Sequence, residues 1–220
     1  MSLWSEFLNN QHRPIHKWIH YFPIYERHFG IFRDRAITFL EIGCGEGGSL
    51  QMWKRWLGPR VRIIGLDIRE ECRAFAEDQI TIEIGDQSDP ALLRRLHETY
   101  GPFDAVLDDG SHIMRHIHAS FDQLYPVMSI DGVYMVEDLH TAYWDEYEGG
   151  LRRPGSFIER CKDLIDHLNA PHIREDIGAA GLPSERFADE TWSMCFYDSI
   201  AVFERAPRRA THAPVIGKTP

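Results

Sequence analysis

The stretch AITFLEIGCGEGGSLQMWKRWL, residues 36–57, decides the fold of this chain. Residues 36–42 form a short apolar run typical of a buried strand, residues 43–49 are rich in glycine, and residues 50–57 have a helical pattern. Glycines let the backbone approach a ligand closely, and the start of a helix presents unpaired N–H groups. The order strand, glycine turn, helix therefore predicts a doubly wound α/β fold with a ligand at the turn. The spacing also fits the fingerprint GxGxxG, which does not name the cofactor.

Four more apolar runs follow, and each of the five strands predicted in this way finishes on an acidic residue, namely Glu41, Asp67, Asp86, Asp108 and Glu137. Ligands of open α/β sheets bind outside the carboxyl ends of the strands, so we expect these acids to converge on one crevice. The second acid stands where a carboxylate meets both hydroxyls of a ribose, a role that serves NAD and S-adenosylmethionine (SAM) equally.

Two acidic clusters stand out at these strand ends. Asp108-Asp109-Gly110-Ser111-His112 follows the run FDAVL, and Glu137-Asp138 follows GVYMV. Four carboxylates and an imidazole in one crevice suit a hard dication such as Mg²⁺, and a nearby histidine can then take a proton from a substrate hydroxyl. The alternative is structural, because acids at strand ends also cap helices and DDGS is good turn sequence. The coincidence of both clusters with the glycine turn favours the functional interpretation.

The motifs EIGCGEGGS, GLDI, GDQSD, DDGSH and VEDLHTAYW resemble the bacterial metal-dependent sugar O-methyltransferases of the mycinamicin, macrocin and tetracenomycin-rhamnose type, within the class I SAM-dependent methyltransferases. The similarity spans residues 36–205, and the closing FYDSIAVFER resembles the last strand of that family. The resemblance implies a mostly parallel seven-stranded sheet with an N-terminal helical preface. Compared with the mycinamicin-type members, the chain is expected to lack a large N-terminal domain and its substrate contacts.

The resemblance also implies site residues. For SAM they are Glu41, Gly43, Gly45, Ser49, Asp67, Asp86, Gln87 and Asp108. Within this set Asp67 would bind the ribose and Asp86 would lie near the adenine, whereas Asp108 is left open between cofactor, metal and substrate. Asp109, Glu137 and Asp138 would hold Mg²⁺ or Mn²⁺, and His112, with Asp109 in the catalytic set, would be the general base and not a ligand.

Substrate contacts are expected from Tyr21, His140, Tyr143 and Trp144. Trp144 could equally belong to the core, and His140 also has a structural interpretation. We expect a helical preface over residues 1–35 that packs on a sheet edge, a methyltransferase domain over 36–205 and a flexible tail over 206–220. His12, His16 and His20 recur at helical spacing and predict one helix face.

Composition excludes several classes. The formal net charge of −10 argues against nucleic acid as the substrate, since phosphate backbones require a basic surface. No long apolar run or secretory leader is recognised, so we expect a cytoplasmic protein without membrane contact. The four cysteines lack CxxC spacing and predict neither a zinc site nor disulfides, and Cys44 is interpreted as a small buried residue.

The sequence thus predicts Mg²⁺-assisted methyl transfer from SAM to a sugar hydroxyl, on a glycosylated natural product, a rhamnosyl lipid or a mannose-type oligosaccharide. A homodimer is one expected assembly. Three alternatives stay open: a catechol or phenol O-methyltransferase, an NAD-dependent oxidoreductase, and a non-catalytic SAM-binding accessory subunit. The oxidoreductase leaves the two acidic clusters without a role.

Overall fold

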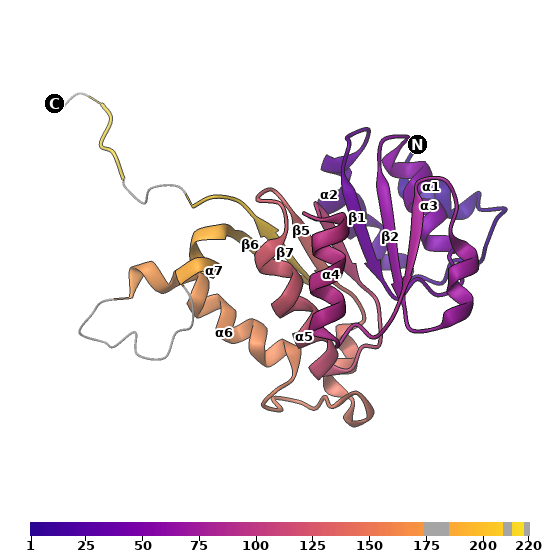
Figure 1. The fold of residues 1–220 in the computed structure, drawn as a ribbon. Coiled ribbons are helices and arrows are strands. Elements are labelled where there is room, and N and C mark those ends of the chain that lie inside the picture. The colour runs from indigo at the N-terminus through magenta and orange to yellow at the C-terminus, as the bar shows by residue number, and fades with distance from the viewer. Residues whose placement is uncertain (174–184, 209–212, 218–220) are drawn as a thin grey trace.

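The computed structural model describes residues 1–173, 185–208 and 213–217 and contains one sheet of seven strands in the order β3-β2-β1-β4-β5-β7-β6 (Figure 1). The strands are β1 (Thr38–Ile42), β2 (Arg62–Asp67), β3 (Ile80–Ile84), β4 (Ala105–Asp108), β5 (Val133–Val136), β6 (Thr191–Tyr197) and β7 (Ile200–Arg205). Strands β1 to β5 are parallel, and β7 runs antiparallel to both of its neighbours. This is the mostly parallel seven-stranded sheet that the sequence predicts.

Helices connect the strands and cover both faces of the sheet. The α-helices are α1 (Leu3–Leu8), α2 (Phe22–Phe29), α3 (Gly48–Leu57), α4 (Pro90–Tyr100), α5 (Met114–Leu124), α6 (Phe157–Asn169) and α7 (Glu185–Glu190). Short 3₁₀ turns are η1 (Ile19–Tyr21), η2 (Gly30–Phe32), η3 (Glu70–Phe75), η4 (Tyr125–Val127), η5 (Leu139–Tyr143), η6 (Asp145–Tyr147) and η7 (Ala170–His172).

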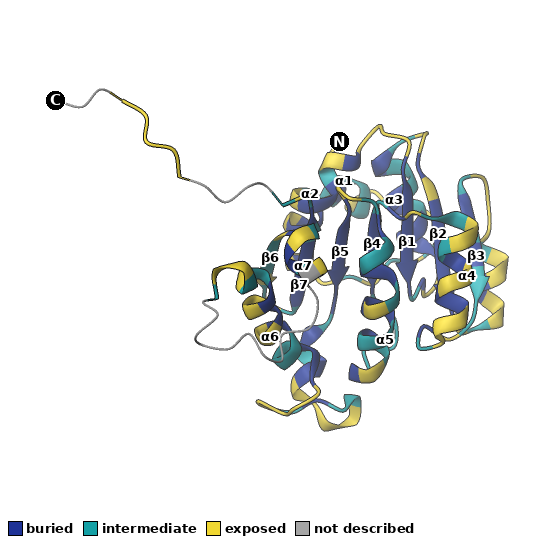
Figure 2. Cartoon of the chain, turned by 60° about the vertical axis from the view of Figure 1, so that its left-hand side comes forward, coloured by how far each residue is buried: buried dark blue, intermediate teal, exposed yellow. Residues whose placement is uncertain are grey.

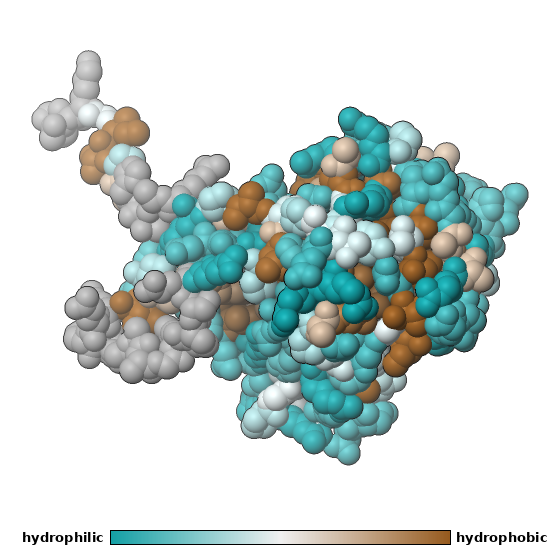
Figure 3. Space-filling model, viewed as in Figure 1, coloured by the Kyte–Doolittle hydropathy of each residue, from teal (hydrophilic) through white to brown (hydrophobic). Residues whose placement is uncertain are grey.

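Two apolar layers enclose the central strands. Helices α1, α2 and α3 bury their apolar sides on one face, and α4, α5 and α6 do so on the other. All five residues of β1 are buried because both of its faces are covered, which explains its continuous apolar run (Figure 2). The outer surface is mostly hydrophilic in the view of Figure 3, with hydrophobic groups between the polar residues. No helix in the described parts of the chain is long and apolar enough to cross a membrane.

Local sequence sets the ends of these helices. Asp89 accepts a hydrogen bond from the amide of Ala91 and Pro90 occupies the first turn of α4, while Ser156 accepts from the amide of Glu159 at the start of α6. The glycine turn enters α3 through Gly47, whose φ of +75° is a left-handed conformation.

The N-terminal preface covers a face of the sheet and not its edge. Its aromatic residues belong to the same buried cluster as α3 and the strands of that face. The helix face predicted for His12, His16 and His20 is wrong, because residues 9–18 are not helical. Pro14 has no backbone N–H, so it cannot donate the hydrogen bond that a continuous helix would need at this position. Of the predicted tail, residues 213–217 are exposed, whereas 209–212 and 218–220 lie outside the described residues.

Candidate active site

A cavity of about 430 Å³ opens at the carboxyl ends of the parallel strands. It lies between the ends of the parallel strands and the stretch 16–18 of the preface, as the topology of an open α/β sheet predicts. Its walls contain the following predicted site residues: Gly43, Gly45, Asp67, Asp86, Gln87, Asp109, His112, Glu137 and Asp138. The structure therefore brings together most of the acids that the sequence places at strand ends.

The glycine turn shapes one end of this cavity. A Cβ added to Gly43, whose φ is +82°, would lie 2.1 Å from the carbonyl oxygen of Asp109, so only glycine fits against the loop after β4. A Cβ on Gly45, at φ +52°, would meet nothing within 4 Å, because this residue borders open space. The turn thus has one glycine for packing and one that leaves room for a ligand.

Asp67 lines the same end of the cavity as the glycine turn. Its Oδ2 accepts a hydrogen bond from the amide of Gly45 at 3.2 Å, and its Oδ1 accepts from the amide of Arg69 at 3.0 Å and from its Nε at 3.3 Å. Burial pushes the pKa of Asp67 upward, but the hydrogen bonds from Arg69 outweigh it and hold this pKa below its usual value. The carboxylate is therefore ionised and ready to accept hydroxyl donors.

Asp86 and Gln87 follow β3 and have different surroundings. Asp86 is exposed, and hydrogen bonds from the amide and hydroxyl of Ser88 lower the pKa of its carboxyl. Gln87 is buried, donates to Asp108 Oδ1 at 3.0 Å and accepts from the amide of Ser111 at 2.7 Å. Gln87 therefore holds the loop after β4 as well as lining the cavity.

Asp108, predicted in the cofactor set, lies behind the cavity and not in its wall. Its side chain is buried and accepts hydrogen bonds from Ser120, from Gln87 and from the hydroxyl of Tyr134 at 3.1 Å. Burial raises its pKa despite these donors. The structure gives Asp108 the role of an internal anchor between β4, β5 and α5.

Glu41 and Ser49, also predicted for the cofactor, are buried beside the cavity. The hydroxyl of Ser49 donates to Glu41 Oε2 at 2.9 Å. Among the described residues Glu41 Oε1 accepts no hydrogen bond, and it lies 3.4 Å from Lys17 Nζ. Burial raises the pKa of Glu41.

Lys17 is the main site residue that sequence reasoning missed. Its side chain is 3 % exposed, and its ammonium donates to Asp109 Oδ2 at 2.5 Å and lies 3.1 Å from both carboxylate oxygens of Glu137. Burial alone would lower the pKa of Lys17, but the carboxylates of Asp109, Glu137 and Glu41 raise it well above its usual value. The only signal in the sequence is a lysine within the aromatic stretch before the first strand.

Two tyrosines from the preface donate hydrogen bonds to the same group of carboxylates. The hydroxyl of Tyr25 donates to Glu137 Oε1 at 2.5 Å, and that of Tyr21 donates to Asp138 Oδ1 at 2.7 Å. Burial is the first cause that raises the pKa of Glu137, and the nearby Asp109 adds to it. Tyr21, predicted to contact substrate, therefore positions an acidic side chain.

Asp109, Asp138 and His112 form the open part of the acidic cluster. His112 Nε2 lies 3.9 Å from Asp109 Oδ1 and 3.7 Å from Asp138 Oδ2. One donor atom from each of the three residues lies within 4.8 Å of the others. His112 and Asp138 have left-handed φ values of +58° and +54°, which turn these side chains toward one another across the two loops.

This donor set fits a hard dication. Asp109 and Asp138 each direct one oxygen into the shared space while their second oxygens are held by Lys17 and Tyr21. Carboxylate oxygens are the ligands that Mg²⁺ takes together with water and substrate oxygens. Glu137, the third predicted ligand, lines the cavity, but both of its oxygens contact Lys17.

A second cavity of about 450 Å³ adjoins His140 and Tyr143, two of the predicted substrate contacts. His140 Nδ1 lies 2.6 Å from the hydroxyl of Ser199 and 4.0 Å from Asp138 Oδ1, so this residue stands between the second cavity and the acidic cluster. Trp144 is 45 % exposed and lies against the ring of His140, with the centroids 4.8 Å apart. The alternative that Trp144 belongs to the core is therefore wrong.

Comparisons with known proteins agree with this geometry. The chain is 39 % identical to an 8-demethyl-8-alpha-L-rhamnosyl tetracenomycin-C 2'-O-methyltransferase of Streptomyces olivaceus, over 86 % of this chain and 51 % of that protein. It is 43 % identical to a demethylmacrocin O-methyltransferase of Streptomyces fradiae, over 86 % of this chain and 50 % of that protein. No protein-family model matches the chain.

The solved structures include the MycE methyltransferase from the mycinamycin biosynthetic pathway in complex with Mg and SAH. It superimposes with a TM-score of 0.80 at 34 % identity, over 93 % of this chain and 54 % of that chain. This chain thus spans about half the length of the curated relatives that it matches. Over the stretch that it shares with them, the chain is homologous to sugar O-methyltransferases of macrolide and tetracenomycin pathways, and it has the class I methyltransferase fold.

Proposed function

We propose that this chain is a SAM-dependent, Mg²⁺-assisted O-methyltransferase that acts on a sugar hydroxyl of a glycosylated small molecule. One observation carries the proposal: a single cavity has the glycine turn and Asp67 at one end and the open oxygens of Asp109 and Asp138 at the other. The first end suits the ribose and sulfonium of SAM, and the second suits a cation beside the acceptor oxygen.

Each residue of the cavity has a separate proposed role. Asp67 accepts hydrogen bonds from the ribose, Gly45 leaves room for the cofactor, and Asp86, exposed at the rim, lies toward the adenine. Asp109 and Asp138 would hold Mg²⁺, and Glu137 would be the third ligand, deeper in the cavity wall. Bound there, Mg²⁺ supplies positive charge that favours loss of a proton from a neighbouring hydroxyl.

His112 is the general base in this proposal. Its Nε2 faces the open oxygens of both aspartates, so it stands beside the space in which the acceptor hydroxyl must lie. Transfer of the hydroxyl proton to Nε2 makes the oxygen nucleophilic as it attacks the methyl carbon in line with the departing sulfur. We assign the remainder of the acceptor to the second cavity, which His140 and Tyr143 line, with Trp144 as a further contact beside the ring of His140. His140 adjoins both this cavity and the acidic cluster.

The test is methyl transfer to a panel of glycosides. The chain is incubated with SAM, Mg²⁺ and macrolide or anthracycline-like glycosides, their aglycones, and catechols, and product and S-adenosylhomocysteine (SAH) are measured by mass spectrometry. We expect methylation of glycosides only. Methylation of catechols alone would favour the phenol alternative, and SAH binding with no transfer to any acceptor would favour the accessory subunit.

Calorimetry separates the cofactor question from the acceptor. SAH should bind, and Asp67→Ala should weaken it strongly, whereas Asp131→Ala, an exposed acid before β5, should not. Binding of NAD without any response to SAH would support the oxidoreductase instead.

We further propose the divisions and setting expected from the sequence: a preface over 1–35, a methyltransferase domain over 36–205, a tail over 206–220, a homodimer, action in the cytoplasm, and no binding of nucleic acid. The four cysteines are free, which is typical of proteins of a reducing compartment. Sedimentation analysis tests the dimer, and a gel-shift titration with RNA tests the last point.

A further inference from the structure

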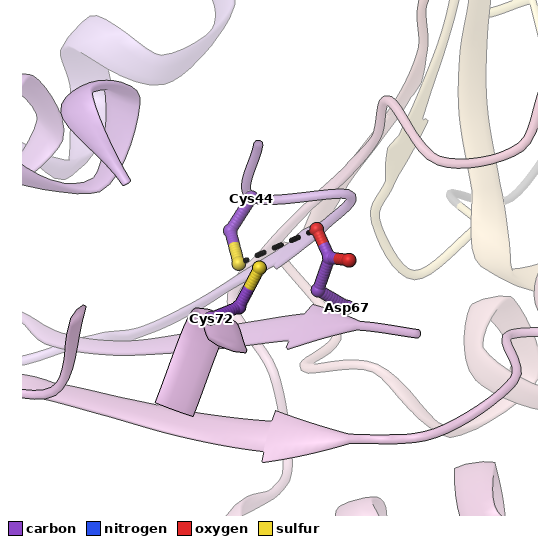
Figure 4. Close-up of side chains that lie close together, drawn as sticks. All are labelled: Cys44, Asp67 and Cys72. Atoms are coloured by element: carbon purple, nitrogen blue, oxygen red, sulfur yellow. Dashed lines mark hydrogen bonds between the residues drawn. The ribbon is translucent and has the colours of Figure 1, made fainter. Parts of the chain in front are cut away.

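Two cysteines and Asp67 meet under the cofactor end of the cavity (Figure 4). Cys44 comes from the glycine turn after β1, Asp67 ends β2, and Cys72 lies in η3. One donor atom of each lies within 4.8 Å of the other two, and the Cys44 thiol is 3.7 Å from Asp67 Oδ2. All three residues are buried. Their spacing along the chain conceals this cluster, which is why the cysteine count predicts no metal site.

The two thiols lie against polar groups, unlike most buried cysteines. A buried free cysteine usually behaves as a small hydrophobic residue. All three buried cysteines belong to apolar clusters of the core, Cys161 to the one under α4, α5 and α6 and Cys44 and Cys72 to the one on the other face. Cys44 and Cys72 have polar contacts as well: the Cys44 thiol points at a carboxylate, and the Cys72 thiol donates to the carbonyl oxygen of Gly45 at 3.5 Å.

Two sulfurs and one carboxylate oxygen form the donor set of a thiophilic dication. Zn²⁺ binds thiolate at about 2.3 Å and carboxylate at about 2.0–2.2 Å, so donors about 4 Å apart can share one ion. Thiolates select Zn²⁺ and softer ions, whereas all-oxygen sites suit Mg²⁺. The chain therefore has two adjacent donor sets of different softness, with the sulfur set beside Asp67 and the oxygen set at Asp109 and Asp138.

We propose that Cys44, Cys72 and Asp67 bind one thiophilic dication of the Zn²⁺ and Cd²⁺ class, and that this ion and the cofactor exclude one another. Asp67 has two oxygens: Oδ1 is held by Arg69, and Oδ2, which also accepts from the amide of Gly45, is the one that faces the Cys44 thiol. An ion on Oδ2 takes the carboxylate away from the ribose hydroxyls. The exclusion, though not the ion site itself, rests on the proposed role of Asp67 in SAM binding.

The direct test uses Cd²⁺ as the probe. The full chain, reduced with a phosphine and freed of metal, is titrated with Cd²⁺ while the sulfur-to-cadmium charge-transfer absorbance is recorded in the ultraviolet. We expect one Cd²⁺ per chain, no displacement by excess Mg²⁺, and loss of the band in Cys44→Ser and in Cys72→Ala. Cys161→Ala is the matched control and should keep the band. Circular dichroism establishes that each variant is folded.

The exclusion is measured by calorimetry with SAH. When Cd²⁺ is present at about ten times its Kd, the apparent Kd for SAH should rise about tenfold in the wild type and stay unchanged in Cys72→Ala. A missing band, or a band that survives in both cysteine variants, overturns the ion site. An unchanged SAH affinity beside a normal band overturns the exclusion. Failure of the metal-free protein to bind SAH refutes the proposed function and the exclusion with it, while the absorbance titration still decides the ion site.

Discussion

Replacing Lys17 with methionine should destabilise the fold far more than an ordinary lysine substitution. The side chain of Lys17 is 3 % exposed, and its ammonium faces the carboxylates of Glu41, Glu137 and Asp109, of which the first two are buried. Removal of one partner from a buried ion pair costs about 3–5 kcal/mol, because the remaining charge stays buried without compensation. Three carboxylates share this one cation, so we expect a loss at the upper end of that range.

The matched control is Lys54→Met. Lys54 also pairs with a carboxylate, at 3.2 Å from Glu77, but its side chain is 25 % exposed. Exposed pairs contribute about 0–1 kcal/mol, so this substitution should have little effect. Urea unfolding in EDTA, monitored by circular dichroism, gives the free energy of unfolding of both variants. Equal losses in the two would refute the reasoning.

The pH dependence provides a second check. Because the pKa of Glu137 is raised in the folded protein, its carboxyl binds protons more tightly there than in the unfolded chain. Its contribution to stability is therefore lost as pH rises through the folded pKa. Without the ammonium this pKa rises further, so the deficit of Lys17→Met should widen as pH rises above the range in which an exposed glutamate titrates. A deficit that is constant or shrinks as pH rises in this way would contradict the assignment of the buried cation.

Three further outcomes are expected. His112→Ala should lower turnover by roughly 10²–10⁴ while the affinity for Mn²⁺, measured by electron paramagnetic resonance, stays near that of the wild type; loss of Mn²⁺ would make His112 a ligand. Activity should vanish in EDTA and return with Mg²⁺ or Mn²⁺, with most of that recovery lost in Asp138→Ala, whereas full activity after chelation would leave the acids as structural caps. Tyr134→Phe should cost about 1–3 kcal/mol in urea unfolding because Asp108 loses one donor, and a neutral result would remove its anchor role.

The sequence predicts the centre of the sheet well because strands β1, β4 and β5 are fully buried. A strand covered on both faces has a continuous apolar run, and glycine or acidic residues end it, so β1, β4 and β5 fall within two residues of their expected bounds. The non-helical stretch 9–18 was harder to predict. Its histidine spacing imitates a helix, whereas its real partners are residues far away in the chain.

The site was predictable only as far as strand ends determine it. Topology alone brings Asp67, Asp109 and Asp138 to one cavity. Topology does not say which strand-end acid is exposed to that cavity, and Asp108 differs from Asp109 only in pointing to the other side of the strand end. Contacts between distant segments, such as Lys17 with Glu137, leave no local pattern in the sequence.

The separation in sequence between Lys17 and its partners has a consequence for the synthesis of the chain. The lysine precedes Glu137 by 120 residues and Asp109 by 92. At about 5–20 residues per second, the ribosome needs roughly 6–24 s to reach the second carboxylate after making the lysine. Throughout that time the centre lacks Glu137, although Glu41 and Asp109 are made earlier. We expect the first thirty or so residues to dock onto the sheet last. Pulses of protease applied during translation should therefore cleave this segment until the chain leaves the ribosome. Early protection of the segment from the protease would show that it docks sooner.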